Sequence, residues 1–334
     1  MRLAVIGFGG VGKAFLKLLN DKKEELLEEG IDLKVNYILS SRGGIYNPKG
    51  INTMEFLNNS TTFSKDIIFD TILKNRDVDM VVEMTPTNIE DGEPGMTHIT
   101  KSLENGFHVV TANKGPILLA YKRLKEIAAK NNVQLGIGCT TGGALPTVNG
   151  GIIDLAGSKI LSIEGVLNGT SNFILNEMES KGVEYMEALK MAQKLGIAET
   201  NPSLDVDGWD TATKLLILTN VLMNQNKTMN DVKVEGITSI TSADIKEAAK
   251  NGLKYKLIGR TIKKEKDLEI SVSLQKIDTD NHLYGVEGKN KAVRYVSDTL
   301  GDLTIIGGAS GVAPAAASIL RDIVNICRGY KFIQ

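Results

Sequence analysis

The sequence predicts an α/β protein of two domains, a doubly wound parallel sheet followed by a second α/β domain with a mixed or antiparallel sheet. Two observations predict this fold class. Strand-like and helical segments alternate through about the first 135 residues, and the alternation stops after Gly142, where strand-like runs follow one another. We therefore place the first domain at residues 1–137 and 309–334, and the second at residues 138–308.

The first domain consists of repeated strand–helix units. Its strand-like runs are rich in valine, isoleucine and leucine, and cover residues 3–6, 33–39, 79–84, 108–111 and 133–137. Amphipathic helical patterns follow them, beginning near Val11, Ser64, Gly95 and Pro116. This order is typical of a parallel sheet with helices on both faces.

The second domain has a different order of elements. We expect a helix at residues 145–155, a strand at 160–167, three helical stretches between Ser171 and Met223, and strands at 257–262, 268–274 and 303–306. A glycine-rich segment, residues 307–311, then leads into a helix through Cys327, which we expect to return to the first domain. A mostly antiparallel or mixed sheet follows from this pattern.

The composition favours small-molecule partners. The formal charge is −1 and 42% of the 334 residues are hydrophobic, so there is no electrostatic bias toward nucleic acid or a membrane surface. The chain enters a strand without a cationic leader, and its apolar runs, such as residues 215–218, are too short to span a membrane. We therefore expect a cytoplasmic protein. The only two cysteines, Cys139 and Cys327, form neither a disulfide framework nor a metal cage.

A glycine-rich segment joins the first strand to the first helix. It reads Gly7-Phe8-Gly9-Gly10-Val11-Gly12. In such a Rossmann-type turn the first glycine allows a sharp bend, the second leaves room for a pyrophosphate, and the third permits close packing of helix on strand. The N–H groups and dipole of the helix attract the anion. This context predicts a site for NAD or NADP.

The end of the second strand bears on which nucleotide binds. NAD-preferring sites place a carboxylate there for the ribose hydroxyls, whereas an arginine accommodates a 2′-phosphate. Here the strand ends Leu39-Ser40-Ser41-Arg42, without a carboxylate. Ser40 and Arg42 therefore favour NADP, while NAD remains open because Arg42 can also be an ordinary surface residue.

A lysine and an aspartate four residues apart predict a proton-transfer site. If residues 207 onward are helical, Asp207, Asp210 and Lys214 fall on the arc that later carries Ile217 and Leu218. Charges on an otherwise buried arc line a cleft, whereas a surface ion pair contributes only about 0.3–0.5 kcal/mol. A desolvated lysine exchanges a proton near neutral pH, and a neighbouring carboxylate positions it. Lys214 is the proton donor that this pattern indicates.

Two further segments lie at the ends of parallel strands, where ligands of such sheets bind. Lys114 follows the strand at residues 108–111 and precedes a helix. Thr85, in Thr85-Pro86-Thr87, ends the preceding strand and is placed to contact the nicotinamide ribose. The alternatives are a solvent-facing loop lysine and a helix cap or turn.

Four segments together resemble the homoserine dehydrogenase family. Residues 199–214, with Ala192 and Gly196 upstream, match its signature of Asn/Asp-Pro, Asp, Gly, Asp and Lys at long, specific intervals. Residues 165–172, 111–114 and 308–314 resemble its other landmarks, so the resemblance covers the whole chain. It implies NAD(P)-dependent interconversion of L-aspartate 4-semialdehyde and L-homoserine, a step toward threonine and methionine.

The resemblance also implies roles for individual residues. Lys214 acts as general acid/base, and Lys114 lies near the nicotinamide and the substrate. Residues that bind the substrate or lie beside it are Glu199, Asp205, Asp210, Gly169 and Thr170. In the last landmark, Gly311 approaches the cofactor. A monovalent cation, usually sodium, is held by backbone carbonyls of Gly138, Thr141, Gly143 and Leu145.

Two departures from the family pattern alter these expectations. Ile197 stands where many members have a tyrosine before the Ala-Glu pair, so a polar contact from that position is missing. Many members carry a C-terminal regulatory domain, which we do not expect here, so threonine feedback through such a domain is not expected either. The resemblance further implies a homodimer paired through the second domain.

Three other functions would place different demands on these residues. An acylating aldehyde dehydrogenase would use Cys139 as a thiolate nucleophile with a histidine base, and the chain has only three histidines, His98, His108 and His282. A non-catalytic nicotinamide-binding sensor would not need the Asp210 and Lys214 pair. A two-hydroxy-acid dehydrogenase would need an Asp–His relay, which no histidine here suggests.

Overall fold

The computed structural model describes residues 1–59, 62–265 and 267–333. The chain forms two compact units, Met1–Ala144 with Gly311–Gln334, and Leu145–Ser310. Residues 138–144, which we expected in the second domain, are held to the C-terminal helix α14 (Val312–Cys327) of the first unit. Gly138 N donates to Asp322 Oδ2 at 2.7 Å, and Arg321 Nη1 donates to Ala144 O at 3.2 Å.

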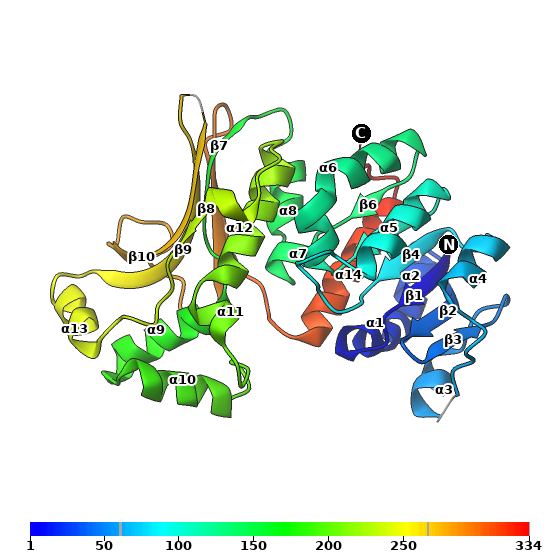
Figure 1. Cartoon of the computed structure of the whole chain (residues 1–334), viewed down its shortest axis with the longest axis horizontal. Coiled ribbons are helices and arrows are strands. Elements are labelled where there is room, and N and C mark those ends of the chain that lie inside the picture. The colour runs from blue at the N-terminus through cyan, green and yellow to red at the C-terminus, as the bar shows by residue number, and fades with distance from the viewer. Residues whose placement is uncertain (60–61, 266, 334) are drawn as a thin grey trace. The chain divides into compact units, whose positions relative to one another are not determined.

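The first unit contains a six-stranded sheet of order β3-β2-β1-β4-β5-β6 (Figure 1). Its strands are β1 (Arg2–Ile6), β2 (Lys34–Ser40), β3 (Gly43–Tyr46), β4 (Met80–Glu83), β5 (His108–Thr111) and β6 (Leu135–Gly136). All neighbours pair in parallel except β2 and β3, which are antiparallel. Strand order reverses direction between β1 and β4, which is where ligands of doubly wound sheets bind. The predicted fold class is confirmed.

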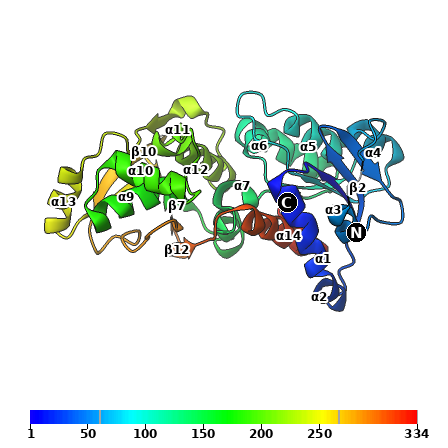
Figure 2. The ribbon, with the colours of Figure 1, turned by 90° about the horizontal axis from the view of Figure 1, so that it is seen from below.

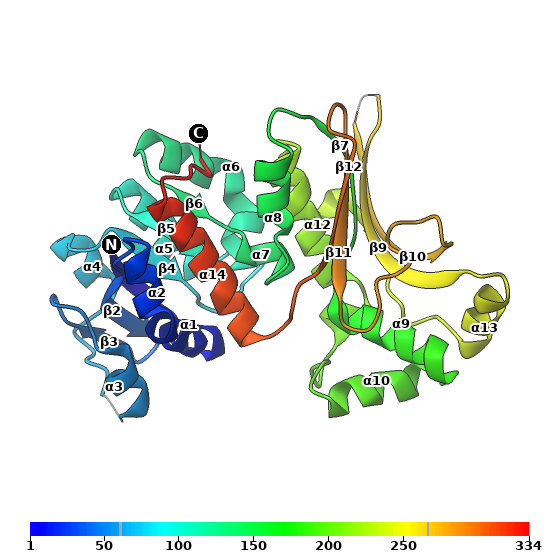
Figure 3. The ribbon, with the colours of Figure 1, turned by 180° about the vertical axis from the view of Figure 1, so that it is seen from behind.

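Helices cover both faces of this sheet. Figures 1 and 3 show α5 (Gly95–Glu104) and α6 (Lys114–Lys130) on one face, and α1 (Gly10–Asp21) and α14 on the other. Figure 2 shows α1 and α14 side by side, where Phe15 and Ile319 lie in the buried core. The remaining helices of this unit are α2 (Lys23–Glu28), α3 (Thr53–Asn58), α4 (Phe69–Asn75) and α7 (Cys139–Gly142).

The structure corrects the sequence prediction at the edge of this sheet. The helix expected near Ser64 begins at Phe69, because Ser64 instead pairs with Gly44 in a β-bridge through two backbone hydrogen bonds of 2.9 Å. The sequence prediction also missed β3 and α3, which lie in the connection after β2. These two elements and the bridge place residues 65–69 opposite the end of β2.

The second unit contains a sheet of order β12-β11-β7-β9-β10-β8. Its strands are β7 (Ile160–Val166), β8 (Val232–Val234), β9 (Lys254–Lys263), β10 (Leu268–Ile277), β11 (Lys291–Ser297) and β12 (Asp302–Gly307). All neighbours are antiparallel except β10 and β8. A mixed, mostly antiparallel sheet was predicted, although β8 and β11 were not.

The helices of the second unit are α8 (Thr147–Asn149), a π-helical turn (Gly150–Asp154), α9 (Gly169–Lys181), α10 (Tyr185–Lys194), α11 (Ser203–Val206), α12 (Trp209–Leu222), a 3₁₀ turn (Met229–Asp231) and α13 (Ser242–Lys250). The helix expected at residues 145–155 is thus a short α-helix continued by a π-helical turn. Figure 3 shows α12 against one face of the sheet, where Thr219 and Thr261 hydroxyls lie 2.7 Å apart. Within the described residues, no helix is long and apolar enough to cross a bilayer.

Candidate active site

The turn between β1 and α1 has the backbone geometry that a bound pyrophosphate requires. Gly7 has φ +106°, and a Cβ there would lie 2.4 Å from Met84 O. A Cβ on Gly12 would lie 2.1 Å from Gly7 O, so α1 packs on the turn only because this residue is glycine. By contrast, a Cβ on Gly9 would meet nothing within 4 Å. The turn therefore presents open space at the N-terminus of α1, where an anion binds.

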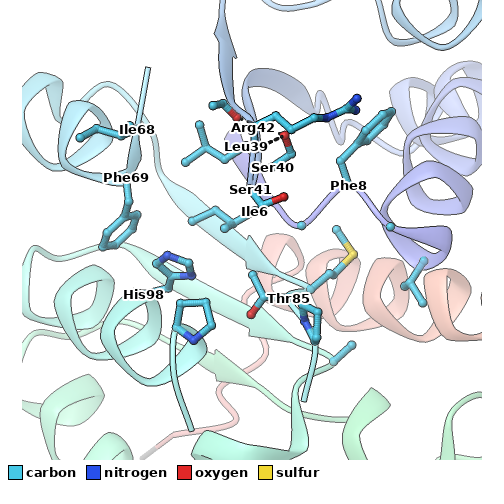
Figure 4. A pocket seen from close by; sticks show the side chains of 18 of the residues that line it. Ile6, Phe8, Leu39, Ser40, Ser41, Arg42, Ile68, Phe69, Thr85 and His98 are labelled. Atoms are coloured by element: carbon cyan, nitrogen blue, oxygen red, sulfur yellow. Dashed lines mark hydrogen bonds between the residues drawn. The ribbon is translucent and has the colours of Figure 1, made fainter. Parts of the chain in front are cut away.

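A pocket of about 1100 Å³ extends from this turn within the first unit (Figure 4). It is lined by residues 6–11, 39–43 and 84–87, and by Lys65, Ile67, Ile68, Phe69, Pro94, His98 and Ala112. Most of the predicted cofactor residues line this pocket: Gly7, Phe8, Gly9, Gly10, Val11, Ser40, Arg42 and Thr85. Gly12, Lys114 and Gly311 are not among its lining residues. The volume and the apolar walls suit a nucleotide.

Side chains of the two ends of this pocket differ in character. Figure 4 shows Phe69 and His98 on the side opposite Phe8, and their rings lie 4.7 Å apart. At the end of β2, Ser40 Oγ accepts from Arg42 N at 3.2 Å, and the Arg42 guanidinium lies 5.2 Å from the centre of the Phe63 ring. Among the described residues that line the pocket none is acidic, whereas Arg42 and Lys65 are cationic.

Lys114 lies at the first position of α6, directly after the carboxyl end of β5. Asn113 caps this helix, because its Oδ1 accepts from Gly115 N at 3.1 Å. Thr85 follows the neighbouring strand β4 and lines the pocket. Both residues are therefore at the carboxyl edge of the parallel sheet, as their sequence positions indicated.

A cluster of polar side chains in the second unit surrounds Asn168, which is 4% exposed. Its Nδ2 donates to Asp205 Oδ1 at 2.6 Å and to Asp210 Oδ2 at 2.9 Å. Its Oδ1 accepts from Ser171 N at 2.9 Å and caps α9. One amide thus connects two carboxylates to the N-terminus of a helix.

Lys214 pairs with Asp210 in this cluster, with Nζ 2.5 Å from Asp210 Oδ2. Lys214 Nζ also donates to Leu167 O at 2.9 Å, at the end of β7. The two side chains are only 15% and 12% exposed, so this is not a solvated surface pair. A lysine held in this way has its ammonium group fixed at one place, which proton transfer to a substrate requires.

Asp207 does not belong to the charged arc of α12. The helix begins at Trp209, and Gly208 before it has φ +90°, a conformation that breaks the helical register. Asp207 instead ends the short helix α11. Our expectation that Asp207, Asp210 and Lys214 share one helical face was wrong for Asp207.

The other substrate residues expected from the resemblance lie around the start of α9 and in the loop after α10. Thr170 Oγ1 donates to Ile197 O at 3.1 Å. A Cβ on Gly169 would lie 2.7 Å from Lys289 O, so a larger residue would displace that loop. Glu199 is exposed, and its backbone oxygen accepts from Gln193 Nε2 at 3.2 Å.

The sequence analysis missed the role of Asn168 as the centre of the cluster. Its motif was noted, but an asparagine before Gly-Thr reads equally well as a helix cap. A second signal is its position: Asn168 follows a strand and lies in the segment 165–172, which also resembles the family. Together these favour a site residue over a simple helix cap.

The loop with the expected cation ligands runs through α7. Gly138 precedes the helix, Thr141 lies within it, and Gly143 follows with φ +62°. The Leu145 oxygen accepts from Thr147 N at 2.8 Å. In the described part of the chain, no group of three His, Cys, Asp or Glu side chains is placed to hold a metal ion.

Cys139 is buried in α7, and its thiol donates to Ala315 O at 3.5 Å. Two of the histidines have other surroundings: the His98 ring packs against Phe69 at a tilt of 57°, and His108 Nδ1 accepts from Gln134 N at 2.9 Å. A buried thiol that donates to a carbonyl is not an activated nucleophile.

A glycine turn at the reversal point of a parallel sheet, a nucleotide-sized pocket, and a largely buried lysine–aspartate pair are typical of an NAD(P)-dependent dehydrogenase. Comparison with known proteins specifies the family. The family model "Homoserine dehydrogenase, NAD binding domain" matches residues 7–137, and the family model "Homoserine dehydrogenase" matches residues 146–324.

Individual relatives agree over the whole chain. A homoserine dehydrogenase of Methanocaldococcus jannaschii is 38% identical over 340 residues, covering 99% of this chain and 100% of the relative. An NAD(+)-dependent homoserine dehydrogenase of Pseudomonas canavaninivorans is 34% identical, covering 97% and 96%. The crystal structure of a putative homoserine dehydrogenase from Archaeoglobus fulgidus superposes with a TM-score of 0.89 at 32% identity, covering 98% and 99%.

The chain belongs to the homoserine dehydrogenase family. Its reaction is the NAD(P)-dependent interconversion of L-homoserine and L-aspartate 4-semialdehyde in amino-acid biosynthesis. The predicted enzyme class and nicotinamide cofactor are confirmed, and neither the acylating nor the non-catalytic alternative is favoured.

Proposed function

We propose that Lys214 is the general acid/base of this reaction and that Asp210 positions it. The observation that carries the proposal is the 2.5 Å pair between Lys214 Nζ and Asp210 Oδ2, with Lys214 also bound to Leu167 O. When bound, the nicotinamide would supply a hydride to the carbonyl carbon of the semialdehyde, or accept one from the alcohol carbon of homoserine. Lys214 gives a proton to the oxygen of that carbonyl during reduction and removes it during oxidation of homoserine.

The remaining polar residues of the cluster bind the amino-acid part of the substrate. A zwitterion needs carboxylates for its ammonium group and cations or N–H groups for its carboxylate. We assign Glu199 and Asp205 to the ammonium group, with Gly169 and Thr170 beside the substrate. Asn168 fixes Asp205 and Asp210 at 2.6 and 2.9 Å, which supports this assignment. Lys114, at the start of α6, approaches both nicotinamide and substrate.

We propose that NADP is the preferred nucleotide. Ser40 and Arg42 at the end of β2 offer a hydroxyl and a guanidinium to a 2′-phosphate, and the pocket lining contains no acidic side chain among the described residues. Phe63 supports the Arg42 guanidinium from 5.2 Å. The Pseudomonas relative is NAD(+)-dependent by name, so NAD is the competing candidate.

Steady-state oxidation of homoserine with NAD and NADP side by side tests substrate and nucleotide together. We expect turnover with both and a higher kcat/KM with NADP. Higher kcat/KM with NAD would overturn the nucleotide preference alone. Binding of either nucleotide without oxidation of homoserine would overturn the proposed mechanism.

We also propose that the carbonyl oxygens of Gly138, Thr141, Gly143 and Leu145 bind a monovalent cation, for which sodium is the probe. The support is the family resemblance of this loop and the suitability of neutral carbonyl oxygens for a cation of low charge. Activity measured at constant ionic strength while sodium replaces a bulky organic cation tests it. A rate that does not depend on sodium would contradict the proposal.

We propose that the chain forms a homodimer through the second sheet. Gly259 and Thr261 face α12, so Arg260 between them points to the opposite face. There Glu164 lies 2.6 Å from Arg260 and 3.3 Å from Arg294, which also pairs with Asp302. Ile306 of β12 is 51% exposed on the same sheet. A face that carries both positive and negative side chains can pair with the same face of a second copy. Sedimentation of the Glu164→Arg variant tests this dimer interface, and we expect the variant to be monomeric.

A further inference from the structure

The carboxylate of Glu83, the last residue of β4, is fully buried in the first unit. It accepts hydrogen bonds from the backbone N–H of Thr85 at 2.9 Å, from the Thr85 hydroxyl, and from Thr111 Oγ1 at 3.0 Å. Burying a carboxylate is costly unless its oxygens are satisfied. Three donors directed at one side chain therefore mark a built acceptor site at the carboxyl edge of the sheet.

This carboxylate connects the two loops that follow β4 and β5. Thr111, its partner on β5, accepts at Oγ1 from Asn113 N at 2.9 Å. Asn113 then caps α6 and donates from Nδ2 to Thr85 Oγ1 at 3.3 Å and to Pro86 O at 3.4 Å. The loop that lines the pocket and the loop that ends at Lys114 are thus joined through Glu83.

Neighbouring residues pack closely against the two loops. A Cβ on Gly115 would lie 1.9 Å from Asn88 O, and a Cβ on Gly95 would lie 2.5 Å from Asn113 Nδ2. The pocket residue His98 approaches the same carboxylate, with Nδ1 3.9 Å from Glu83 Oε1. The positions of Thr85 and Asn113 are therefore fixed by hydrogen bonds and by close contact together.

The two halves of a dinucleotide fall on different parts of this unit. The turn of Gly7–Gly12 would hold the pyrophosphate and the end of β2 the adenosine ribose, so the residues that would hold the nicotinamide half are those at the ends of β4 and β5. We propose that Glu83 is a positioning residue that holds Thr85 and Lys114 for the nicotinamide half of the cofactor. This inference rests on the proposed placement of the nucleotide.

The donors around Glu83 require a side chain with two oxygens that both accept hydrogen bonds. A glutamine has one acceptor oxygen, and its NH₂ group would face either the Thr85 N–H and hydroxyl or the Thr111 hydroxyl. Glu83→Gln therefore keeps the shape of the side chain but leaves at least one buried donor without its acceptor. Loss of such a bond loosens one or both loops without altering Ser40 or Arg42.

The test compares binding of a whole dinucleotide with binding of its adenylate half by calorimetry. The pairs are NADP with adenosine 2′,5′-bisphosphate, or NAD with ADP if NAD is the nucleotide that the wild type uses. For Glu83→Gln we expect the Kd of the dinucleotide to rise about tenfold and the Kd of the adenylate half to change less than about twofold. Thr111→Val leaves the pocket lining intact and removes one of the three donors to Glu83. We expect it to weaken the dinucleotide but not the adenylate half, and it replaces Glu83→Gln in the test if that variant does not fold.

A matched control is Glu184→Gln. Glu184 is an exposed carboxylate of the second unit that accepts from the backbone N–H and the hydroxyl of Ser242, as Glu83 does from Thr85. Its dinucleotide Kd is expected to equal that of the wild type. Equal weakening of both ligands in Glu83→Gln, or no weakening of either, overturns the positioning role. A wild-type chain that binds no dinucleotide overturns the proposed function first, and this inference with it.

Discussion

The buried amide of Asn168 offers a prediction whose magnitude follows from the structure. Asn168→Asp keeps the shape of the side chain and the oxygen that caps α9, but it replaces an NH₂ donor by a carboxylate. That carboxylate would face Asp205 and Asp210 at 2.6 and 2.9 Å. Each hydrogen bond to a charged group contributes about 1.5–3 kcal/mol to stability. The loss of two is therefore expected to lower the free energy of unfolding by about 3–6 kcal/mol.

The loss falls on the second unit and on its substrate residues. Since each 1.4 kcal/mol is a factor of ten, we expect kcat/KM for homoserine to fall at least about 100-fold. The Kd of the nucleotide is expected to change less than about twofold, because the nucleotide pocket belongs to the first unit. Fluorescence titration of the nucleotide, initial rates with homoserine, and urea unfolding measure the three quantities.

Two further variants separate the added negative charge at residue 168 from the loss of its amide hydrogen bonds, and from the general effect of an aspartate at a helix cap. Asn168→Ser keeps a capping residue without adding charge, and we expect a smaller loss in kcat/KM and in the free energy of unfolding. Asn52→Asp changes an exposed asparagine that caps α3 through Glu55 N, and we expect no effect on rate beyond about twofold. A folded Asn168→Asp variant with wild-type kcat/KM would refute the reasoning.

Three other predictions concern single side chains. Arg42→Ala is expected to weaken NADP about 10-fold to 100-fold and to leave the Kd of NAD unchanged, since one charge-assisted contact to a phosphate is lost; equal effects on both nucleotides would contradict this. Cys139→Ser is expected to keep kcat within about twofold, whereas near-complete loss of turnover would favour a thioester route. Burial lowers the pKa of Lys256, 1% exposed, to about 8, so between that pH and about 10.5 the unfolded chain binds a proton that the folded chain does not. Lys256 should therefore raise the free energy of unfolding by about 3 kcal/mol over that interval, measured as the difference between the pH profiles of the wild type and of Lys256→Met in urea unfolding, and parallel profiles would contradict the assignment.

Local patterns predicted much of the first unit. The glycine turn follows from steric limits on residues 7–12, and the alternation of strands and helices is visible over short windows. The edge elements β3 and α3 were missed because they are short and their pairing, such as the bridge of Ser64 with Gly44, involves residues distant in sequence. The π-helical turn after α8 begins with two consecutive glycines, Gly150 and Gly151, which weaken the α-helix expected there.

The candidate site was predictable where one helix carries it. Asp210 and Lys214 lie four residues apart on α12, so the pattern alone indicated their pair. Asp207 was wrongly included because a left-handed Gly208 before the helix is not evident from periodicity. Asn168 and Glu83 act through contacts 28 to 42 residues away in sequence, and no local pattern reveals such contacts.

The central claim is that the Lys214 ammonium group transfers the proton. Lys214→Met retains most of the side-chain volume and removes the charge, and the matched control is Lys181→Met. Lys181, whose side chain is 54% exposed, pairs with Glu177 at the same four-residue spacing and the same 2.5 Å distance. We expect kcat for homoserine oxidation to fall at least about 1000-fold in Lys214→Met, with nucleotide Kd unchanged, and no change in Lys181→Met. A folded Lys214→Met variant that oxidises homoserine within tenfold of the wild-type rate would contradict the account.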